Sequence, residues 1–463
     1  MLIPEDQLVR PYPSLDYITK DGLNKEFESL INRYMRFIDE NRTARDTTST
    51  VLDRLTNKKY SKDGDRKFYM TNADKTAFAV ANKGTRPITE GLSIIYVHTD
   101  SPALIVKANP LRFAMDPEHT MKDLGVRVDT TPYGGIMPHQ WFGHPVQIRG
   151  HAVRNHRVRD IRVNGYIPDY AAHVDNRLRA REEYDESFLA EALDVLLGDS
   201  SKKDTLKRFG MRSEREFVSA HLYVVPDNKP RNLGGRLISG YGQDDRICVF
   251  TGLEAFLEVD KPRYTTVFIG FDGEETEAQG AFSAGGSFFE SIIDTVYERL
   301  SPQSKSLGST RSTRSHEQRL REMLGKSLAI SADVDVGGGH NELRDEGRIY
   351  GVDIYGTAMI GAGPAIKTPR GVVEGFTPSA FVNDRFVTIL ERNRVPYQTV
   401  TTAQKADDAG DARMHAEYLA RRGVPTIEFG PSGSSLHAPS ELFATGDVFW
   451  TKRGYKAFFE RER

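Results

Sequence analysis

The stretch SIIYVHTDSPAL, residues 93–104, joins an apolar run directly to a histidine and an aspartate. Four consecutive apolar residues are typical of a buried β-strand. The run stops at His98 and Asp100, and Pro102 cannot donate to a strand ladder. Two interpretations are open. The polar residues form a capping turn, because Asp and Ser favour such positions, or the strand ends at a functional site.

Strands and helices alternate over much of the chain. Apolar residues at helical spacing within 14–40 predict an amphipathic helix. DDRICVFTGLEAFLEV at 244–259 has the pattern of a helix, and YTTVFIGFDGEE at 264–275 has that of a strand followed by an acidic turn. SLAISADVDVGGG at 327–339 has the pattern of a strand that runs into glycines. This alternation predicts an α/β fold with a mostly parallel sheet.

The region from about residue 106 to 235 has a different pattern. Gly and Pro recur, and both HPVQIRGHAVR at 144–154 and DIRVNGYIP at 160–168 alternate apolar with polar residues, as antiparallel strands do. The sequence therefore predicts one α/β domain formed by residues 1–105 and 236–463, with a β-rich insertion over 106–235.

Composition excludes several classes of partner. The 463 residues include 63 Lys and Arg against 65 Asp and Glu, and this net charge of −2 favours neither nucleic acid nor an anionic membrane. The single cysteine, Cys248, excludes an internal disulfide and a thiolate metal cluster. We find no secretory signal and no apolar run near the ~18 residues of a membrane helix. We therefore expect a soluble, cytoplasmic protein, in which the Ser- and Arg-rich segment 301–320 is a solvated loop or a partner patch.

Side chains able to bind a metal follow several of the predicted strands. In open α/β sheets ligands bind at the carboxyl ends of strands, so these side chains can meet there. Two imidazoles and several carboxylates without a thiolate suit a divalent ion such as Zn²⁺, Mn²⁺ or Co²⁺. The residues at strand ends, or at the start of the helix over 244–259, are His98, Asp100, Asp244, Asp245, Asp272, Glu274, Glu275, Asp333, Asp335 and His437.

The spacing of these residues suits a hydrolytic site with two metal ions. Such a site needs a carboxylate that bridges ions ~3.5–4 Å apart, and a base that is not itself a ligand. Adjacent Glu274 and Glu275 can divide these tasks, one binding a metal while the other takes a proton from the attacking water. Asp100, two residues beyond His98, is well spaced to hold the imidazole.

Simpler interpretations are also open. Asp244 or Asp245 can cap the helix that follows them, and the acidic end of 264–275 can be a solvated turn. His437 lies in a Gly- and Ser-rich loop, where a surface histidine is equally common. Two further residues near the glycine run are expected to take no part, Asp335 and His340.

Short motifs along the chain together resemble the aspartyl aminopeptidase family of two-metal aminopeptidases. Each motif is short, but their order is specific and the match runs through most of the chain. The motifs are HTDSP at 98–102, YGG at 133–135, WF at 141–142, QDDR at 243–246, FDGEE at 271–275, SAD at 331–333, GPAIK at 363–367 and LH at 436–437.

The resemblance implies two divalent ions in each subunit, most simply Zn²⁺, with Mn²⁺ or Co²⁺ as alternatives. His98 and Asp333 would bind one ion, and Glu275 and His437 the other. Asp244 would bridge both ions.

The resemblance also implies the remaining roles. Glu274 would be the general base, and Asp100 would orient the first histidine. The insertion would be a dimerisation domain, with dimers assembling into a tetrahedral dodecamer whose enclosed sites admit peptides. His173 resembles a histidine that family members contribute to a neighbouring subunit's site. Lys367 can pair with an acidic substrate side chain, or it can be a structural surface lysine.

The chain departs from the family pattern at three places. Asp245 and Arg246 stand where family members usually have an asparagine and an apolar residue. SAD is followed by VDVGGGHNEL rather than by a Pro-Asn element, and GPAIK is followed by TPRGVVEGF. A preference for acidic N-terminal residues is therefore open. We predict a metallo-aminopeptidase that removes N-terminal amino acids from peptides through water activated by two metals. The alternatives are a two-metal deacylase or carboxypeptidase acting on N-acyl amino acids, and a catalytically silent shell-forming homologue.

Overall fold

The computed structural model is of the whole chain. It describes residues 13–113, 125–169, 193–278, 280–301, 315–338, 348–349, 352–353, 358–367, 379–400 and 415–462.

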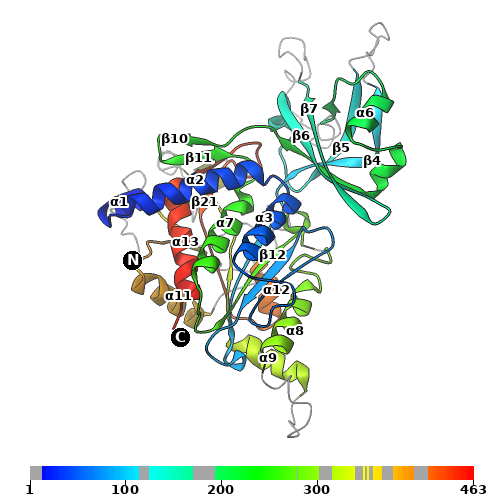
Figure 1. Cartoon of the computed structure of the whole chain (residues 1–463). Helices are drawn as coiled ribbons and strands as arrows, with labels where there is room; N and C mark the ends of the chain where they lie inside the picture. Colours follow the sequence, from blue (N-terminus) through cyan, green and yellow to red (C-terminus); the bar gives the residue numbers. More distant parts are fainter. Residues whose placement is uncertain are drawn as a thin grey trace.

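An eight-stranded sheet forms the centre of the larger part of the molecule (Figure 1). Its four central strands are parallel to one another. The next strand on each side pairs antiparallel with this central group, and the outermost strand is antiparallel to its neighbour on one side of the sheet and parallel to it on the other. The predicted α/β class is confirmed, with a mixed rather than a purely parallel sheet. In spatial order the strands are β1 (Lys67–Thr71), β2 (Phe78–Asn82), β12 (Thr265–Phe271), β3 (Leu92–His98), β13 (Leu328–Ser331), β20 (Thr426–Gly430), β18 (Ala365–Lys367) and β19 (Gln398–Val400).

Helices cover both faces of this sheet, which explains why β3 is apolar without a break. Ile95 and Val97 pack on one face, while Ile94 and Tyr96 pack on the other. Burial of each such side chain stabilises the fold by roughly 1.5–3 kcal/mol. The first face carries α2 (Asn24–Glu40), α3 (Ala44–Asn57), α7 (Gln243–Glu258), α11 (Ala380–Arg392) and α13 (Thr445–Phe459), and the second carries α8 (Phe288–Leu300), α9 (His316–Lys326) and α12 (His415–Arg421).

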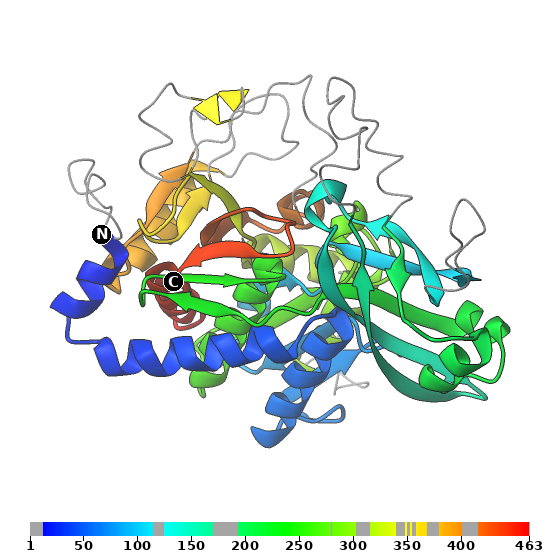
Figure 2. The ribbon, with the colours of Figure 1, turned by 90° about the horizontal axis from the view of Figure 1, so that it is seen from above.

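A closed β-barrel stands beside this α/β part (Figures 1 and 2). Its longest hairpin turns through Asn155 and His156, which both have positive φ, as a two-residue turn between twisted strands requires. Val126, Ile148 and Val224 belong to its own apolar core. In spatial order its strands are β4 (Ala103–Phe113), β5 (Val126–Tyr133), β8 (Val195–Leu196), β7 (Arg157–Ile167), β6 (His144–Arg154) and β9 (Ala220–Pro226), with α6 (Lys202–Arg208) packed nearby.

A second, six-stranded sheet contains strands from before and after α7. In it, the strand that ends at Gly240, just before α7, pairs with the strand that begins at Glu441, just after the LH motif. Its strands are β10 (Arg231–Leu233), β11 (Leu237–Gly240), β22 (Glu441–Ala444), β21 (Ser432–Ser434), β14 (Asp335–Gly338) and β17 (Ala358–Met359). The remaining elements are α1 (Pro13–Lys20), the pair β15 (Arg348–Ile349) and β16 (Val352–Asp353), and the 3-10 turns η1 (Ile88–Glu90), η2 (Pro138–Gln140), η3 (Glu214–Ser219) and η4 (Glu274–Thr276).

Across the ranges given above, every helix is too short or too polar to cross a bilayer.

Candidate metal centre

The carboxyl ends of neighbouring parallel strands bring the candidate residues together. β3 ends at His98, β12 is followed by η4, and Asp333 lies two residues beyond β13. These three strands are adjacent and parallel, so their ends share one edge of the sheet. From β20, the next parallel strand, the chain continues into β21, and the loop after β21 carries His437 to the same place.

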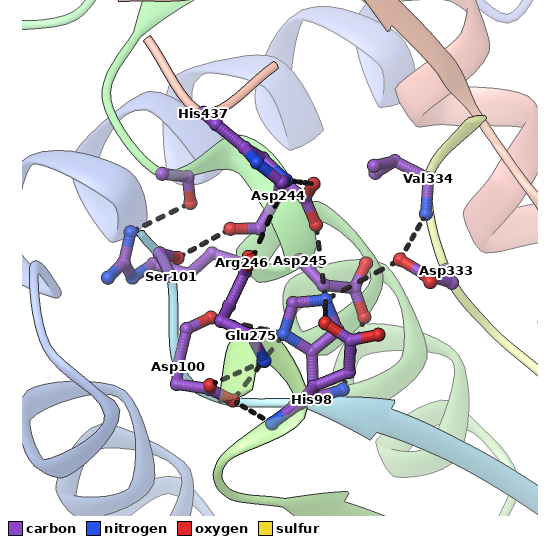
Figure 3. A network of polar contacts seen from close by, with 12 residues as sticks. His98, Asp100, Ser101, Asp244, Asp245, Arg246, Glu275, Asp333, Val334 and His437 are labelled. Carbon is purple, nitrogen blue, oxygen red and sulfur yellow. Dashed lines mark hydrogen bonds and ion pairs between the residues drawn. The ribbon is translucent and has the colours of Figure 1, made fainter. Parts of the chain in front are cut away.

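Asp244 lies between the two imidazoles (Figure 3). Its Oδ1 is 3.1 Å from His98 Nε2, and its Oδ2 is 3.5 Å from His437 Nε2. Asp244 and Asp245 have non-helical backbone angles at the start of α7, and this conformation directs the Asp244 carboxylate into the site rather than along the helix. One carboxylate thus presents its two oxygens to two different histidines, as a bridging ligand does.

The other ligand candidates divide into two groups around Asp244. Asp333 Oδ1 is 3.5 Å from His98 Nε2, whereas Glu275 Oε2 is 3.6 Å from His437 Nε2. We call these groups the His98 half and the His437 half. This division matches the one that the family resemblance implies.

Both imidazoles are held with Nε2 facing the site. His98 Nδ1 lies 3.1 Å from the main-chain oxygen of Asp100, and His437 Nδ1 lies 2.7 Å from that of Gly135. A carbonyl oxygen can only accept a hydrogen bond, so each Nδ1 carries a proton. Each Nε2 faces Asp244 and would give up its own proton to hold a cation.

Asp100 fixes the acidic turn as well as the histidine. Its Oδ1 accepts a hydrogen bond from Glu274 N at 3.2 Å, and its Oδ2 accepts one from Glu275 N at 3.1 Å. Tyr133 Oη donates to the same Oδ2 at 2.8 Å. The Asp100 side chain lies farther from His98 than its main-chain oxygen does, with Oδ1 3.6 Å from Nδ1. Its side chain therefore positions mainly the two glutamates.

Glu274 lies at the edge of the His98 half, with Oε2 4.0 Å from His98 Nε2. Its side chain is 22% exposed, against 4% for that of Glu275. Burial raises the pKa of Glu274 to about 8, with the negative charges of Asp333 and Asp100 acting in the same direction. A carboxyl group near neutral pKa at the open side of the cluster suits a general base.

Electrostatics elsewhere in the cluster also favour a bound cation. Burial raises the pKa of Glu275, and the neighbouring charge of Asp244 adds to this effect. Although burial acts to raise the pKa of Asp244, hydrogen bonds from the two histidines hold it below its usual value. Among the residues that the structure describes, the buried Glu275 Oε1 and Asp245 Oδ1 have no hydrogen-bond partner. A donor set of imidazoles and crowded carboxylates with such oxygens fits divalent cations.

Two carboxylates near the site were not assigned from the sequence. Glu441, at the start of β22, accepts hydrogen bonds from Asp244 N and His437 N, both at 3.0 Å. Its only sequence signal is its place four residues after His437. Asp245 is fully buried, accepts from His98 N at 3.3 Å, and lies within ligand reach of the His98 half.

Of the two residues expected to contact substrate, Lys367 and His173, the structure describes only Lys367. Lys367 is 5% exposed, and its ammonium group donates to Val334 O at 2.7 Å and lies 4.0 Å from Asp335 Oδ1. The alternative of a surface lysine is therefore wrong. Asp335, which was expected to take no part, lies beside the ammonium group of Lys367. His173 and His340 lie outside the described residues.

The chain is similar to known proteins over nearly its whole length. The family model described as Aminopeptidase I zinc metalloprotease (M18) matches residues 37–459. A curated relative from Borreliella burgdorferi, "Probable M18 family aminopeptidase 1", is 27% identical and aligned over 94% of this chain and 98% of its own length. Aminopeptidase I from Clostridium acetobutylicum has a similar crystal structure, with a TM-score of 0.80, 25% identity, and coverage of 98% and 100%.

A more distant structure, the mApe1 dodecamer of the yeast S. cerevisiae, shares the fold with a TM-score of 0.72 at 16% identity and covers 94% of this chain and 97% of its own. The resemblance drawn from the motifs is confirmed at the level of the M18 family, as is the hydrolase class. Because the family model spans nearly the whole chain and the strand ends gather the acids and histidines of a metal centre, the protein belongs to the M18 family of aminopeptidase I zinc metalloproteases and is a metal-dependent aminopeptidase.

Proposed function

We propose that this aminopeptidase uses two divalent ions in each subunit. His98 and Asp333 would hold one ion, Glu275 and His437 the other, and Asp244 both. The observation that carries this proposal is the placement of the two Asp244 oxygens against two different Nε2 atoms. The family is one of zinc proteases, which makes Zn²⁺ the first candidate, although a set of His and carboxylate ligands also accepts Mn²⁺ and Co²⁺.

Glu274 would act as the general base and Asp100 as its positioning partner. When bound, the ions supply positive charge that polarises the scissile carbonyl group and lowers the pKa of water at the site. Glu274 would accept a proton from that water and deliver it to the leaving amine. The two hydrogen bonds from the η4 amides to Asp100 hold the carboxyl group of Glu274 at the rim of the His98 half.

The substrates would be peptides with a free N-terminus. Lys367 would favour an acidic first side chain, because its ammonium group lies beside the Asp333 segment through its bond to Val334 O. Its own partner Asp335 competes for that charge, so recognition of an acidic substrate by Lys367 requires this pair to loosen.

The barrel would form the dimer contact and the subunits a tetrahedral dodecamer in the cytoplasm. The support for assembly is the dodecameric structure of the yeast relative. His173, from the insertion, would reach a neighbouring subunit's site.

The test is release of amino acids from a panel of aminoacyl-4-nitroanilides and free-amine dipeptides. Metal-stripped enzyme would be reloaded with Zn²⁺, Mn²⁺ or Co²⁺, and N-acetylated dipeptides would be assayed in parallel. We expect metal-dependent release from free-amine substrates only, and its loss in Glu274→Gln. Glu277→Gln, an exposed carboxylate just past the same turn, is the matched control and should keep full activity. Release from the acetylated copies instead would indicate a deacylase.

A further inference from the structure

The end of barrel strand β5 enters the metal centre. Three consecutive residues, Tyr133, Gly134 and Gly135, each contact a different part of it. Tyr133 Oη donates to Asp100, and the main-chain oxygen of Gly135 accepts from His437 Nδ1. We call these three residues the barrel tip.

Gly134 packs against the side chain of the proposed ligand Glu275. A Cβ atom at this position would lie 3.1 Å from Glu275 Cβ and 3.2 Å from Glu275 Oε2. The residue also has φ +75°, a conformation that favours glycine. The glycine thus permits the backbone of the barrel to pack directly against the Glu275 side chain.

The two halves of the centre differ in where their support comes from. Around His98, the histidine, Asp333 and the oxygen that fixes the histidine tautomer all come from ends of the central sheet. Around His437, the tautomer is set by a carbonyl of the barrel, and Glu275 packs against the barrel backbone.

Polar contacts distant from the centre seat the barrel against the end of α2 and the turn between β1 and β2. Arg149 of β6 donates to Glu40 O at 3.1 Å, and His151 Nε2 lies 3.0 Å from Asp74 Oδ1. Arg42, buried at the end of α2, donates to Asn228 O at 2.6 Å, just beyond β9. These contacts give the barrel tip a defined position, so that it can act as a support rather than as a loose neighbour.

We propose that Gly134 and Gly135 of the barrel tip position the His437 half of the centre, so that binding of the second ion depends on these two residues whereas binding of the first does not. This inference rests on the proposed two-ion centre. Its physical basis is that groups holding a ligand's orientation typically change metal affinity by about 10- to 100-fold when they are altered. The coupling must also be reciprocal: binding of an ion in the His437 half must stabilise the barrel tip by the same free energy.

The experiment measures metal content and affinity in Gly134→Ala, starting from metal-stripped enzyme. We expect the wild type to bind two ions, and Gly134→Ala to keep one at wild-type affinity while the other is weakened about 10- to 100-fold. Gly198→Ala is the matched control, because Gly198 also has φ +75° in the barrel but has open space where its Cβ would lie. It should bind two ions as the wild type does.

Double variants identify the half that is affected. Gly134→Ala combined with His437→Ala should lose no more metal than His437→Ala alone. Gly134→Ala combined with Asp333→Ala should lose one ion and bind the other about 10- to 100-fold more weakly. Unchanged binding of two ions by Gly134→Ala, or equal weakening of both with a native near-ultraviolet circular dichroism spectrum, would overturn the inference. A wild type that binds fewer than two ions, or a His437→Ala variant that keeps two, contradicts the two-ion centre itself.

Hydrogen exchange on the wild-type enzyme tests the reverse direction and needs no variant to fold. The amide of Ile136 donates to Gly134 O at 3.1 Å, so it reports on the barrel tip. Loading with Zn²⁺ should slow exchange of the peptide that contains this amide by at least about tenfold, the smallest coupling consistent with the affinity change above. Exchange at the same rate in metal-free and loaded enzyme would contradict the inference.

Discussion

Asp100→Asn tests the contacts that position Glu274, the proposed general base. The Asp100 carboxylate accepts two main-chain hydrogen bonds, from Glu274 and Glu275, and one from Tyr133 Oη. An asparagine keeps the shape but has a single oxygen acceptor, and its NH₂ group must face one of the two amides of the turn. Tyr133 can adapt because its hydroxyl group also accepts, but a main-chain N–H cannot.

The magnitude follows from the bond that is lost. A hydrogen bond to a charged group contributes about 1.5–3 kcal/mol. If this full amount is lost from the transition state, in which Glu274 must be correctly placed, kcat falls by about 10- to 150-fold, since 1.36 kcal/mol corresponds to a factor of ten. KM should change little, because Asp100 is buried and its carboxylate oxygens are bonded to the turn and to Tyr133.

The assay is steady-state hydrolysis of the best nitroanilide by metal-loaded enzyme, with metal content measured on the same samples. Tyr133→Phe is the graded control, because it removes only the neutral donor and leaves both turn amides bonded to Asp100. We expect kcat of Tyr133→Phe to fall by less than about tenfold, because the lost hydrogen bond comes from a neutral hydroxyl group and does not hold either amide of the turn. Wild-type kcat in Asp100→Asn, or a loss confined to KM, would refute this reasoning.

Three further predictions follow from single contacts. Glu441→Gln leaves one of the amides of Asp244 and His437 without its acceptor, so metal affinity measured by titration should fall about 10- to 100-fold, and an unchanged affinity would contradict this role. Lys367→Met should lower the ratio of kcat/KM for acidic over neutral N-terminal residues by about tenfold or more, the effect of losing an ionic hydrogen bond; the same ratio in both enzymes would remove Lys367 from substrate recognition. Burial raises the pKa of Asp447 from 3.8 to about 6, so the folded state binds this proton more tightly and stability falls as pH rises from about 4 to 6. The free energy of unfolding falls by about 3 kcal/mol over this range. Asp447→Asn lacks this carboxyl group, so denaturant titrations should show its free energy of unfolding rising by about that amount relative to the wild type between pH 4 and 7. A difference between the two proteins that does not depend on pH would contradict this prediction.

The α/β class and the chemical nature of the site could be predicted because both depend on local patterns. An unbroken apolar run such as that before His98 requires cover on both faces of a strand, and the two core clusters supply it. A histidine or acid that directly follows such a run lies at the carboxyl end of a strand, whichever strands are its neighbours. The sequence therefore determined which ligands are available and at which edge they lie.

Only the tertiary structure decided which of these side chains meet. β12, β3, β13 and β20 are neighbours in space in an order that differs from their order in the chain, and no local pattern encodes that order. Asp244 faces both imidazoles because the two sheets place the start of α7 beside the strand ends.

Supporting contacts are the least visible in the sequence. The carbonyl group of Gly135 fixes the tautomer of a histidine 302 residues away, yet every residue has such a carbonyl group. Glu441 and Lys367 are likewise ordinary charged residues until burial and a fixed partner give them a role. Residue type and periodicity determine what a segment can do, whereas the free energy of packing the whole chain determines which groups lie within bonding distance.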